Sequence, residues 1–152
     1  MRITLLAVGR MKAGAAQDLY ELYAARLRWP LSVKEVEERR SLPPEALKEQ
    51  ESALLLAALP RGARVIALDE GGRQMGSRDF AGLLGRWQDD GTQDLVFLIG
   101  GADGLSKEAR QAAEVILSLG RMTWPHMLVR GLLAEQLFRA ESILAGHPYH
   151  RD

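Results

Sequence analysis

Short apolar runs of strand length alternate with longer amphipathic stretches along these 152 residues, and this alternation restricts the possible folds more than any other feature. It is typical of an α/β domain with a largely parallel sheet flanked by helices. We predict strands over residues 2–8, 32–37, 63–69 and 94–99, and helices over residues 15–29, 43–59, 77–88 and 125–145. Residues 115–119 fit either a short strand or a helix end. The length fits one domain spanning residues 1–152.

The predicted last helix is apolar on two sides. One stripe at helical spacing, which we expect to pack on the sheet, consists of Val129, Leu132, Leu133, Ala140, Ile143 and Leu144. A second stripe consists of Met127, Gly131, Ala134 and Phe138. A mid-helix glycine costs about 1 kcal/mol relative to alanine unless another backbone approaches it closely. We therefore predict that the second stripe is a dimer interface, with a slightly apolar surface as the alternative.

Composition excludes several classes of site and protein. The chain has no cysteine, which rules out disulfides, thiolate zinc sites and cysteine nucleophiles. Its 20 basic and 20 acidic residues cancel, so the overall field does not favour binding of free RNA or DNA. No apolar run approaches the roughly 20 residues of a membrane span, and the N-terminus lacks a signal-peptide cleavage site. We expect a soluble, cytoplasmic protein with no membrane partner.

A glycine-rich turn, residues 100–104, follows the predicted strand 94–99 and leads into a helix. Ligands of parallel α/β proteins bind beyond the carboxyl ends of the strands, so this turn is the first candidate site. It matches neither the dinucleotide-binding pattern nor a phosphate loop. Its glycines either make a tight connection or let the backbone approach a ligand. Three nearby carboxylates are candidates for binding a substrate or a ribose: Asp69, Glu70 and Asp103.

All three histidines lie in the C-terminal part of the chain, at positions 126, 147 and 150. Histidine is the side chain best suited to proton transfer near neutral pH. His147 and His150 have the spacing of a possible metal pair, but Pro148 breaks the helical geometry and no third ligand is nearby, so we predict no metal. An isolated histidine just inside a helix start, such as His126, is more often structural than catalytic.

Four ordered blocks of sequence point to one family. They are Leu98-Ile-Gly-Gly-Ala-Asp-Gly-Leu105, Met122-Thr-Trp-Pro-His-Met-Leu-Val-Arg130, Glu135-Gln-Leu-Phe-Arg-Ala140 and Pro148-Tyr-His-Arg151. In this order, the blocks resemble the RlmH-type members of the SPOUT class of methyltransferases. The resemblance covers the whole chain.

This resemblance implies a C-terminal trefoil knot (the α/β-knot), although connections in proteins normally do not thread loops. It implies transfer of a methyl group from S-adenosylmethionine to N3 of a pseudouridine, of the 1915 type, in 23S ribosomal RNA. It also implies a homodimer with a composite site that acts on the assembled ribosome. The cofactor-binding residues that it implies are Leu68, Gly100, Gly101, Gly120, Arg121, Met122, Thr123, Trp124 and Pro125. The chain departs from the family pattern at Ala102-Asp103 and Trp124.

Methylation of a ring nitrogen needs in-line placement and an electron-rich acceptor. Loss of the imide proton at N3 leaves negative charge on two carbonyl oxygens, which an arginine can stabilise. We therefore expect Tyr149, His150 and Arg151 to bind and orient the target nucleotide. His150 or His126 would assist proton removal, and Arg130 would hold phosphate or base oxygens. The alternatives are a tail that only closes the knot, another RNA target such as tRNA, and a non-enzymatic ribosome-binding factor.

Overall fold

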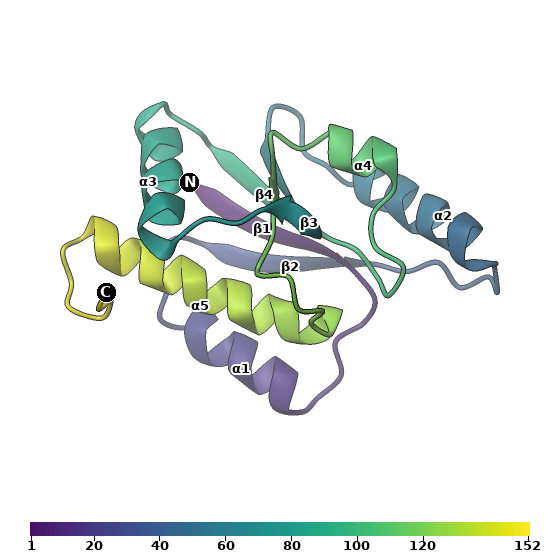
Figure 1. Cartoon of the computed structure of the whole chain (residues 1–152), viewed down its shortest axis with the longest axis horizontal. Helices are drawn as coiled ribbons and strands as arrows, with labels where there is room; N and C mark the ends of the chain where they lie inside the picture. The colour runs from purple at the N-terminus through teal and green to yellow at the C-terminus, as the bar shows by residue number, and fades with distance from the viewer.

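Five parallel strands form the central sheet in a computed structural model that describes residues 1–152. In chain order the elements are β1 (Arg2–Val8), α1 (Ala15–Ala24), β2 (Leu31–Val36), α2 (Pro44–Ala57), β3 (Arg64–Arg73), α3 (Ser77–Asp89), β4 (Asp94–Ile99), α4 (Lys107–Gln111), β5 (Val115–Leu117) and α5 (His126–Leu144). The strand order across the sheet is β2-β1-β4-β3-β5. Figure 1 labels the first four of these strands. The predicted α/β class is confirmed, and the ambiguous segment after α4 contains a strand.

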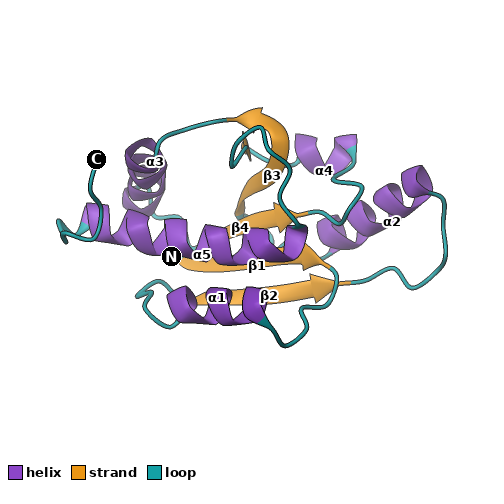
Figure 2. Ribbon diagram, turned by 60° about the horizontal axis from the view of Figure 1, so that its bottom comes forward, coloured by secondary structure: helices purple, strands orange, loops and turns teal.

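The helices cover both faces of the sheet (Figure 2). Successive residues of a strand point to opposite faces, and β1 shows this plainly. Leu5 belongs to a core shared with α3 and α5, whereas Leu6 belongs to a core with Leu55 of α2 and Ala109 of α4. Both cores hold the strands rigidly, so the loops at the strand ends start from fixed points.

Helix α1 is shorter than predicted, because it ends at Ala24 and not at residue 29. A residue before proline disfavours the helical conformation, and Pro30 follows Trp29. The side chain of Glu141 in α5 accepts hydrogen bonds from the backbone N–H of Trp29 and its predecessor. The Trp29 indole then donates to the side chain of Gln88 (3.0 Å) near the end of α3. These contacts come from more than 50 residues away, which explains why local periodicity missed the helix end.

Strand β3 is longer than predicted, because it continues past Asp69 to Arg73. Its extension pairs a second time with the segment at β5, where the backbone N–H of Ser118 donates to the carbonyl of Arg73 (2.9 Å). These two segments of the backbone come so close that a Cβ at Gly72 would lie 2.7 Å from the carbonyl oxygen of Ile116. The paired extension brings the end of β3 over the loop that follows β5.

Helix α1 covers the second apolar stripe of α5 within the same chain, so the prediction that this stripe forms a dimer interface is wrong. A Cβ at Gly131 would lie 2.7 Å from side-chain atoms of Leu19 in α1. Ala134 is fully buried, and the ring of Phe138 lies 6.3 Å from the ring of Tyr23, centroid to centroid. The close approach that Gly131 allows is therefore to α1.

The sheet-facing stripe of α5 is confirmed in part. Leu133 and Ala140 are buried in the core, but Leu144 is 45% exposed near the helix end. Leu137, which the predicted stripe omits, is fully buried and belongs to the same core. None of the helices combines the length and the hydropathy that a membrane span needs.

Candidate functional site

A cleft lies where the carboxyl ends of β3, β4 and β5 meet the start of α5. Its volume of about 290 Å³ is at the lower end of the range for small-molecule sites. Most of the predicted cofactor residues line it: Leu68, Gly100, Gly101, Gly120, Met122, Thr123 and Trp124. Arg121 and Pro125 belong to the same loop but do not line the cleft. The fold thus gathers these segments at one place, and their role in cofactor binding stays a prediction.

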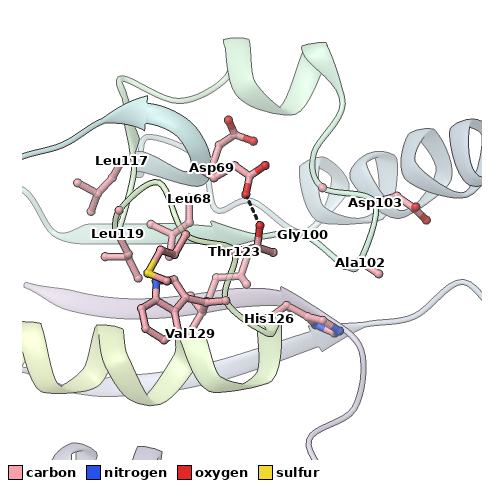
Figure 3. Close-up of a pocket in the computed structure, with 17 residues that line it drawn as sticks. Leu68, Asp69, Gly100, Ala102, Asp103, Leu117, Leu119, Thr123, His126 and Val129 are labelled. Carbon is pink, nitrogen blue, oxygen red and sulfur yellow. Dashed lines mark hydrogen bonds between the residues drawn. The ribbon is translucent and has the colours of Figure 1, made fainter.

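The cleft has an apolar end and a polar end (Figure 3). Leu117, Leu119 and Val129 lie together at one end, and Ala102 and Asp103 lie at the other. The walls also include the other two carboxylates that the sequence singled out, Asp69 and Glu70. An apolar slot beside a polar rim suits a ligand with a flat ring and hydroxyl or charged groups.

The loop between β5 and α5 is anchored to the extension of β3. The hydroxyl of Thr123 donates to the Glu70 carboxylate (3.0 Å), and the hydroxyl of Ser118 lies 3.1 Å from the Glu70 carbonyl oxygen. The loop is open to solvent on both sides of the Thr123 anchor. It carries two exposed large apolar side chains, Met122 before Thr123 and Trp124 after it. Exposed apolar groups beside a cleft mark a surface for a ligand or a partner.

Internal packing accounts for the first two glycines of the turn at residues 100–104. A Cβ at Gly100 would lie 2.7 Å from the carbonyl oxygen of Gly104, so the turn closes only without a side chain. A Cβ at Gly101 would lie 3.1 Å from Oε2 of Glu51 in α2. Of the two sequence interpretations, the tight connection is therefore confirmed, and close approach to a ligand stays a prediction.

His126 is the first residue of α5 and lines the cleft. Its Nδ1 is buried and has no hydrogen-bond partner. Burial first, and then the positive charge of Arg130, lower the pKa of His126 from its ordinary value, while the Val8 backbone opposes them. The ring is therefore neutral near pH 7, which is the form that accepts a proton. The position of His126 in the cleft and the neutral charge of its ring both fit the predicted role in proton removal.

Arg130 is buried inside the fold, so the prediction that it holds substrate oxygens is wrong. Only 1% of the residue is exposed, and its guanidinium donates to Glu35 (2.6 Å) and to the carbonyls of Val8 (3.3 Å) and Gly9 (2.9 Å). Partial burial alone would raise the pKa of Glu35, but hydrogen bonds from Arg130 and from the Met11 N–H outweigh it and lower that pKa. Arg130 therefore ties α5 to the ends of β1 and β2.

The C-terminal tail folds back on the last turns of α5 through Tyr149. Its hydroxyl donates to Glu135 (2.9 Å), and its ring meets the ring of Phe138 edge-on, with centroids 4.6 Å apart. The guanidinium of Arg26 lies 4.2 Å from the centroid of the Phe138 ring. Burial, followed by hydrogen bonds with Tyr23 and Glu135, raises the pKa of the Tyr149 hydroxyl, which therefore stays protonated.

A second set of polar contacts holds His150. Its Nδ1 lies 3.1 Å from the Arg139 guanidinium, which only donates, so the proton of a neutral ring belongs on Nε2. That nitrogen lies 3.1 Å from the Asp152 carboxylate, which also pairs with Arg78 (2.7 Å). Hydrogen bonding to Arg78 first, and then to His150, lowers the pKa of Asp152 to about 2. Arg151 is exposed beside this network.

The tail and the cleft contact different parts of α5: the cleft lies at its first turn, and the tail contacts its middle and its last turns. His126 and Arg139, the residue that contacts His150, lie about 20 Å apart along the helix at 1.5 Å per residue. Figure 1 shows the C-terminus beside the far end of α5, and none of residues 147–152 lines the cleft. His126 and His150 of one chain therefore do not meet. No group of three or more His, Asp or Glu side chains is arranged as metal ligands.

Two buried residues of α2 beneath the cleft were missed by the sequence interpretation. Glu51 lies under Gly101, and the hydroxyl of Ser52 accepts a hydrogen bond from the backbone N–H of Ser106 (2.8 Å). Both residues lie about one helical turn before the buried Leu55, on the face that should be apolar. A carboxylate and a hydroxyl in those positions were the available signal.

Comparison with known proteins assigns the chain to a family. A family model described as a predicted SPOUT methyltransferase matches residues 1–150. The chain is 60% identical over 151 residues to ribosomal RNA large subunit methyltransferase H of Paramagnetospirillum magneticum, covering 99% of each chain. It is 57% identical to the protein of the same name in Rhodospirillum centenum, again over 99% of each chain.

Solved structures show the same fold at low identity. A probable methyltransferase from Bordetella pertussis matches with a TM-score of 0.60 at 16% identity, covering 91% of this chain and 95% of that one. Ribosomal RNA small subunit methyltransferase E of Neisseria gonorrhoeae, solved with S-adenosyl methionine, matches with a TM-score of 0.50 at 12% identity, covering 95% and 66%. Together with the sequence matches, these results show that the chain belongs to the SPOUT methyltransferase family, within the group named ribosomal RNA large subunit methyltransferase H.

Proposed function

We propose that this protein transfers a methyl group from S-adenosylmethionine to N3 of a pseudouridine, of the 1915 type, in the RNA of the large ribosomal subunit. The observation that carries the proposal is the cleft at the strand ends, to which two of the family's sequence blocks, residues 98–105 and 122–130, contribute most of the lining. The high identity to relatives named as large-subunit RNA methyltransferases supports the substrate class. A ribosomal substrate would place the protein in the cytoplasm.

The residues of the cleft fit the proposed cofactor. Leu117, Leu119 and Val129 would enclose the flat adenine ring, because their side chains form the apolar end. The carboxylates of Asp69 and Asp103 would accept hydrogen bonds from the ribose hydroxyl groups and the methionine ammonium group of the cofactor. When bound, S-adenosylmethionine supplies an electrophilic methyl group on a sulfonium.

His126 is the group of the cleft that suits proton removal from the acceptor. Its pKa lies below the ordinary histidine value because of burial and then of Arg130, so it is neutral at the working pH. A neutral imidazole accepts the N3 proton, and the resulting charge spreads onto the two flanking carbonyl oxygens. Histidine bases contribute typically about 10²- to 10⁴-fold to such rates.

A second copy of the chain would bring the tail to the cleft. Tyr149, His150 and Arg151 do not line the cleft of their own chain, so we assign their predicted role to the tail of a partner. A second cavity of about 560 Å³ lies between α1, α3 and α5 and shares Leu119 and Trp124 with the cleft. This cavity offers space beside the cleft for a partner's residues. We therefore propose a homodimer with two composite sites.

The trefoil knot that the family implies forms part of the same proposal. The extension of β3 pairs with the segment at β5, and the hydroxyl of Ser118 donates to the Glu70 carbonyl (3.1 Å). Helix α5 follows immediately and packs against α1 and α3. A threaded C-terminus would explain how a loop with an exposed tip keeps a defined cleft.

The net charge of zero favours a target presented by an assembled ribosome. Binding to free RNA is dominated by neutralised phosphates, for which a balanced protein has no surplus of cations. We expect efficient methylation of ribosomal particles and little methylation of purified ribosomal RNA. Comparable rates on both substrates would contradict this part of the proposal.

The proposal is tested by His150→Ala, with His147→Ala as the matched control. His147 lies in the same tail and is exposed. We expect turnover on ribosomes to fall about 100-fold for His150→Ala, a typical loss for a proton-transfer or positioning group, with cofactor affinity changed less than about twofold. The control should retain activity. Unchanged turnover in His150→Ala would leave the tail with a structural role only.

Two measurements separate the alternative functions. Mass spectrometry of ribosomal RNA from a deletion strain should show loss of one methyl group on a pseudouridine, whereas loss from tRNA would identify another target. Calorimetry with S-adenosylmethionine should show binding. A chain that binds ribosomes but not the cofactor would be a non-enzymatic ribosome-binding factor.

A further inference from the structure

Glu51 is a buried acid that no contact in the fold explains. It lies on α2 with only 8% of its surface exposed, and its Oε1 has no hydrogen-bond partner. Leaving a buried polar group unpaired costs free energy, so such a group calls for an explanation. The carboxyl group lies directly behind Gly101, the residue that forms part of the cleft wall.

A side chain at position 101 would approach Glu51 more closely than ordinary packing allows. A Cβ at Gly101 would lie 3.1 Å from Oε2 and 3.2 Å from Oε1 of Glu51, and 3.2 Å from a methyl group of Val8. The volume that a side chain at position 101 would need is therefore taken by the carboxyl group. The backbone of Gly101 rests on Glu51 on one side and faces the cleft on the other.

The neighbouring residue of α2 supports the far end of the same turn. Ser52, which is 1% exposed, accepts a hydrogen bond from the backbone N–H of Ser106 (2.8 Å). The hydroxyl of Ser106 in turn accepts from the N–H of Ala109 and caps α4. Two consecutive residues of α2 thus contact the turn near its beginning and just after its end.

We propose that Glu51 is a positioning residue, whose carboxyl group sets the conformation of the turn at residues 100–104 from behind, without touching the cofactor. The inference rests on the proposed cofactor role of the cleft. Cofactor affinity should therefore depend on a side chain outside the cleft.

The protonation state of Glu51 makes the idea testable. Burial first, and then the charges of Asp103 in the turn and Glu38 in the loop before α2, raise the pKa of Glu51. Glu38 itself pairs with Arg40 (2.9 Å). The stabilising effect of the neutral carboxyl group is fully present below its unfolded pKa and is lost as pH rises through the folded value. Ionisation should then loosen the turn.

The first measurement uses the unliganded full-length protein, so it does not depend on cofactor binding. NMR amide signals of Gly100, Gly101 and Gly104 are followed from about pH 5 to about pH 8 in the wild type, Glu51→Gln and the control Glu49→Gln. Glu49 lies on the exposed side of α2. We expect these signals to titrate together in the wild type and the control, and to stay constant in Glu51→Gln. The same titration in Glu51→Gln would overturn the proposal.

The second measurement is calorimetry with S-adenosylmethionine. Glu51→Ala should weaken binding about tenfold, a coupling typical of contacting groups, and raise KM for the cofactor while kcat at saturation changes less than about twofold. Gly101→Ala should also weaken binding, and less so in the Glu51→Ala background, where the space behind position 101 is free. Strictly additive losses, or unchanged affinity in Glu51→Ala, would refute the positioning role. If Glu51→Ala does not fold, the titration of Glu51→Gln decides alone.

A wild type whose glycine signals titrate as expected but which binds no cofactor would refute the proposed function, and not the link between Glu51 and the turn.

Discussion

Replacing Arg130 with methionine tests whether this arginine holds the fold together or binds substrate. Methionine keeps an apolar stem of similar length and removes the charge and all donors. In the structure those donors serve Glu35 at 2.6 Å, Gly9 at 2.9 Å and Val8 at 3.3 Å. The variant leaves a carboxylate and two carbonyl groups without their partner.

The expected loss of stability follows from the burial of the two charges. Removing one partner of a fully buried pair costs about 3–5 kcal/mol. The side chain of Arg130 is 1% exposed, but that of Glu35 is 34% exposed, so water takes over part of the lost interaction. We therefore expect about 3 kcal/mol, a large share of the roughly 5–15 kcal/mol that stabilises a typical domain.

Urea unfolding, with the free energy extrapolated to water, measures this loss. Arg110→Met, at an exposed position of α4, is the matched control and should change stability by less than about 0.5 kcal/mol. Adding Glu35→Gln to Arg130→Met should recover about 1 kcal/mol, because the uncompensated charge is removed. A loss below about 1 kcal/mol in Arg130→Met, together with weaker and less salt-dependent binding to ribosomes, would refute the structural role and restore substrate binding.

Three other outcomes are expected. In an NMR titration, the imidazole of His126 should have a pKa below the ordinary histidine value, because burial and then Arg130 lower it. The stability contributed by the neutral ring is lost as pH falls through the pKa of the folded state. A pKa at the ordinary value would contradict the buried geometry. Asp152→Asn should increase fast backbone motion of the tail in NMR relaxation, since its pairing with Arg78 is lost; unchanged motion would mean that the aromatic contacts suffice. Gly131→Ala should lower the stability measured by thermal unfolding by about 1 kcal/mol, because overpacking against Leu19 exceeds the gain in helix propensity. Adding Leu19→Ala should reduce this loss. An equal loss in the double variant would mean that the clash is with another residue.

The elements were predictable because each reflects a local pattern. Apolar runs and helical periodicity located four of the five strands and the long helices, but contacts between distant segments decided their ends. Trp29 leaves the helical conformation partly because Glu141 binds its backbone, and no local pattern shows a partner 112 residues away. The same limit explains Arg130, whose partner Glu35 lies 95 residues earlier. The sequence placed Arg130 near the predicted site and so suggested a substrate contact, although its side chain is buried and paired with Glu35.

The candidate site was predictable as a set of segments and not as a set of contacts. The glycine turn and the loop before α5 stood out because the blocks resemble a family, and the fold brings them together. The glycines of the turn allowed either a tight connection or close approach to a ligand, and the structure shows that a side chain at position 101 would meet the carboxyl group of Glu51. Which side of a glycine is crowded depends on the packing of α2, and the sequence around the turn carries no information about it.

The position of β4 in the sheet has a consequence for the order in which the chain can fold during synthesis. This strand lies between β1 and β3, both of which are made before it. A chain growing from its N-terminus can pair β1 with β2 early, but β3 has neither neighbour until residues 94–99 and 115–117 exist. The cleft also needs Val129 of α5. Chains that end before Val129 therefore lack a complete cleft, and with it the site that we propose for the cofactor.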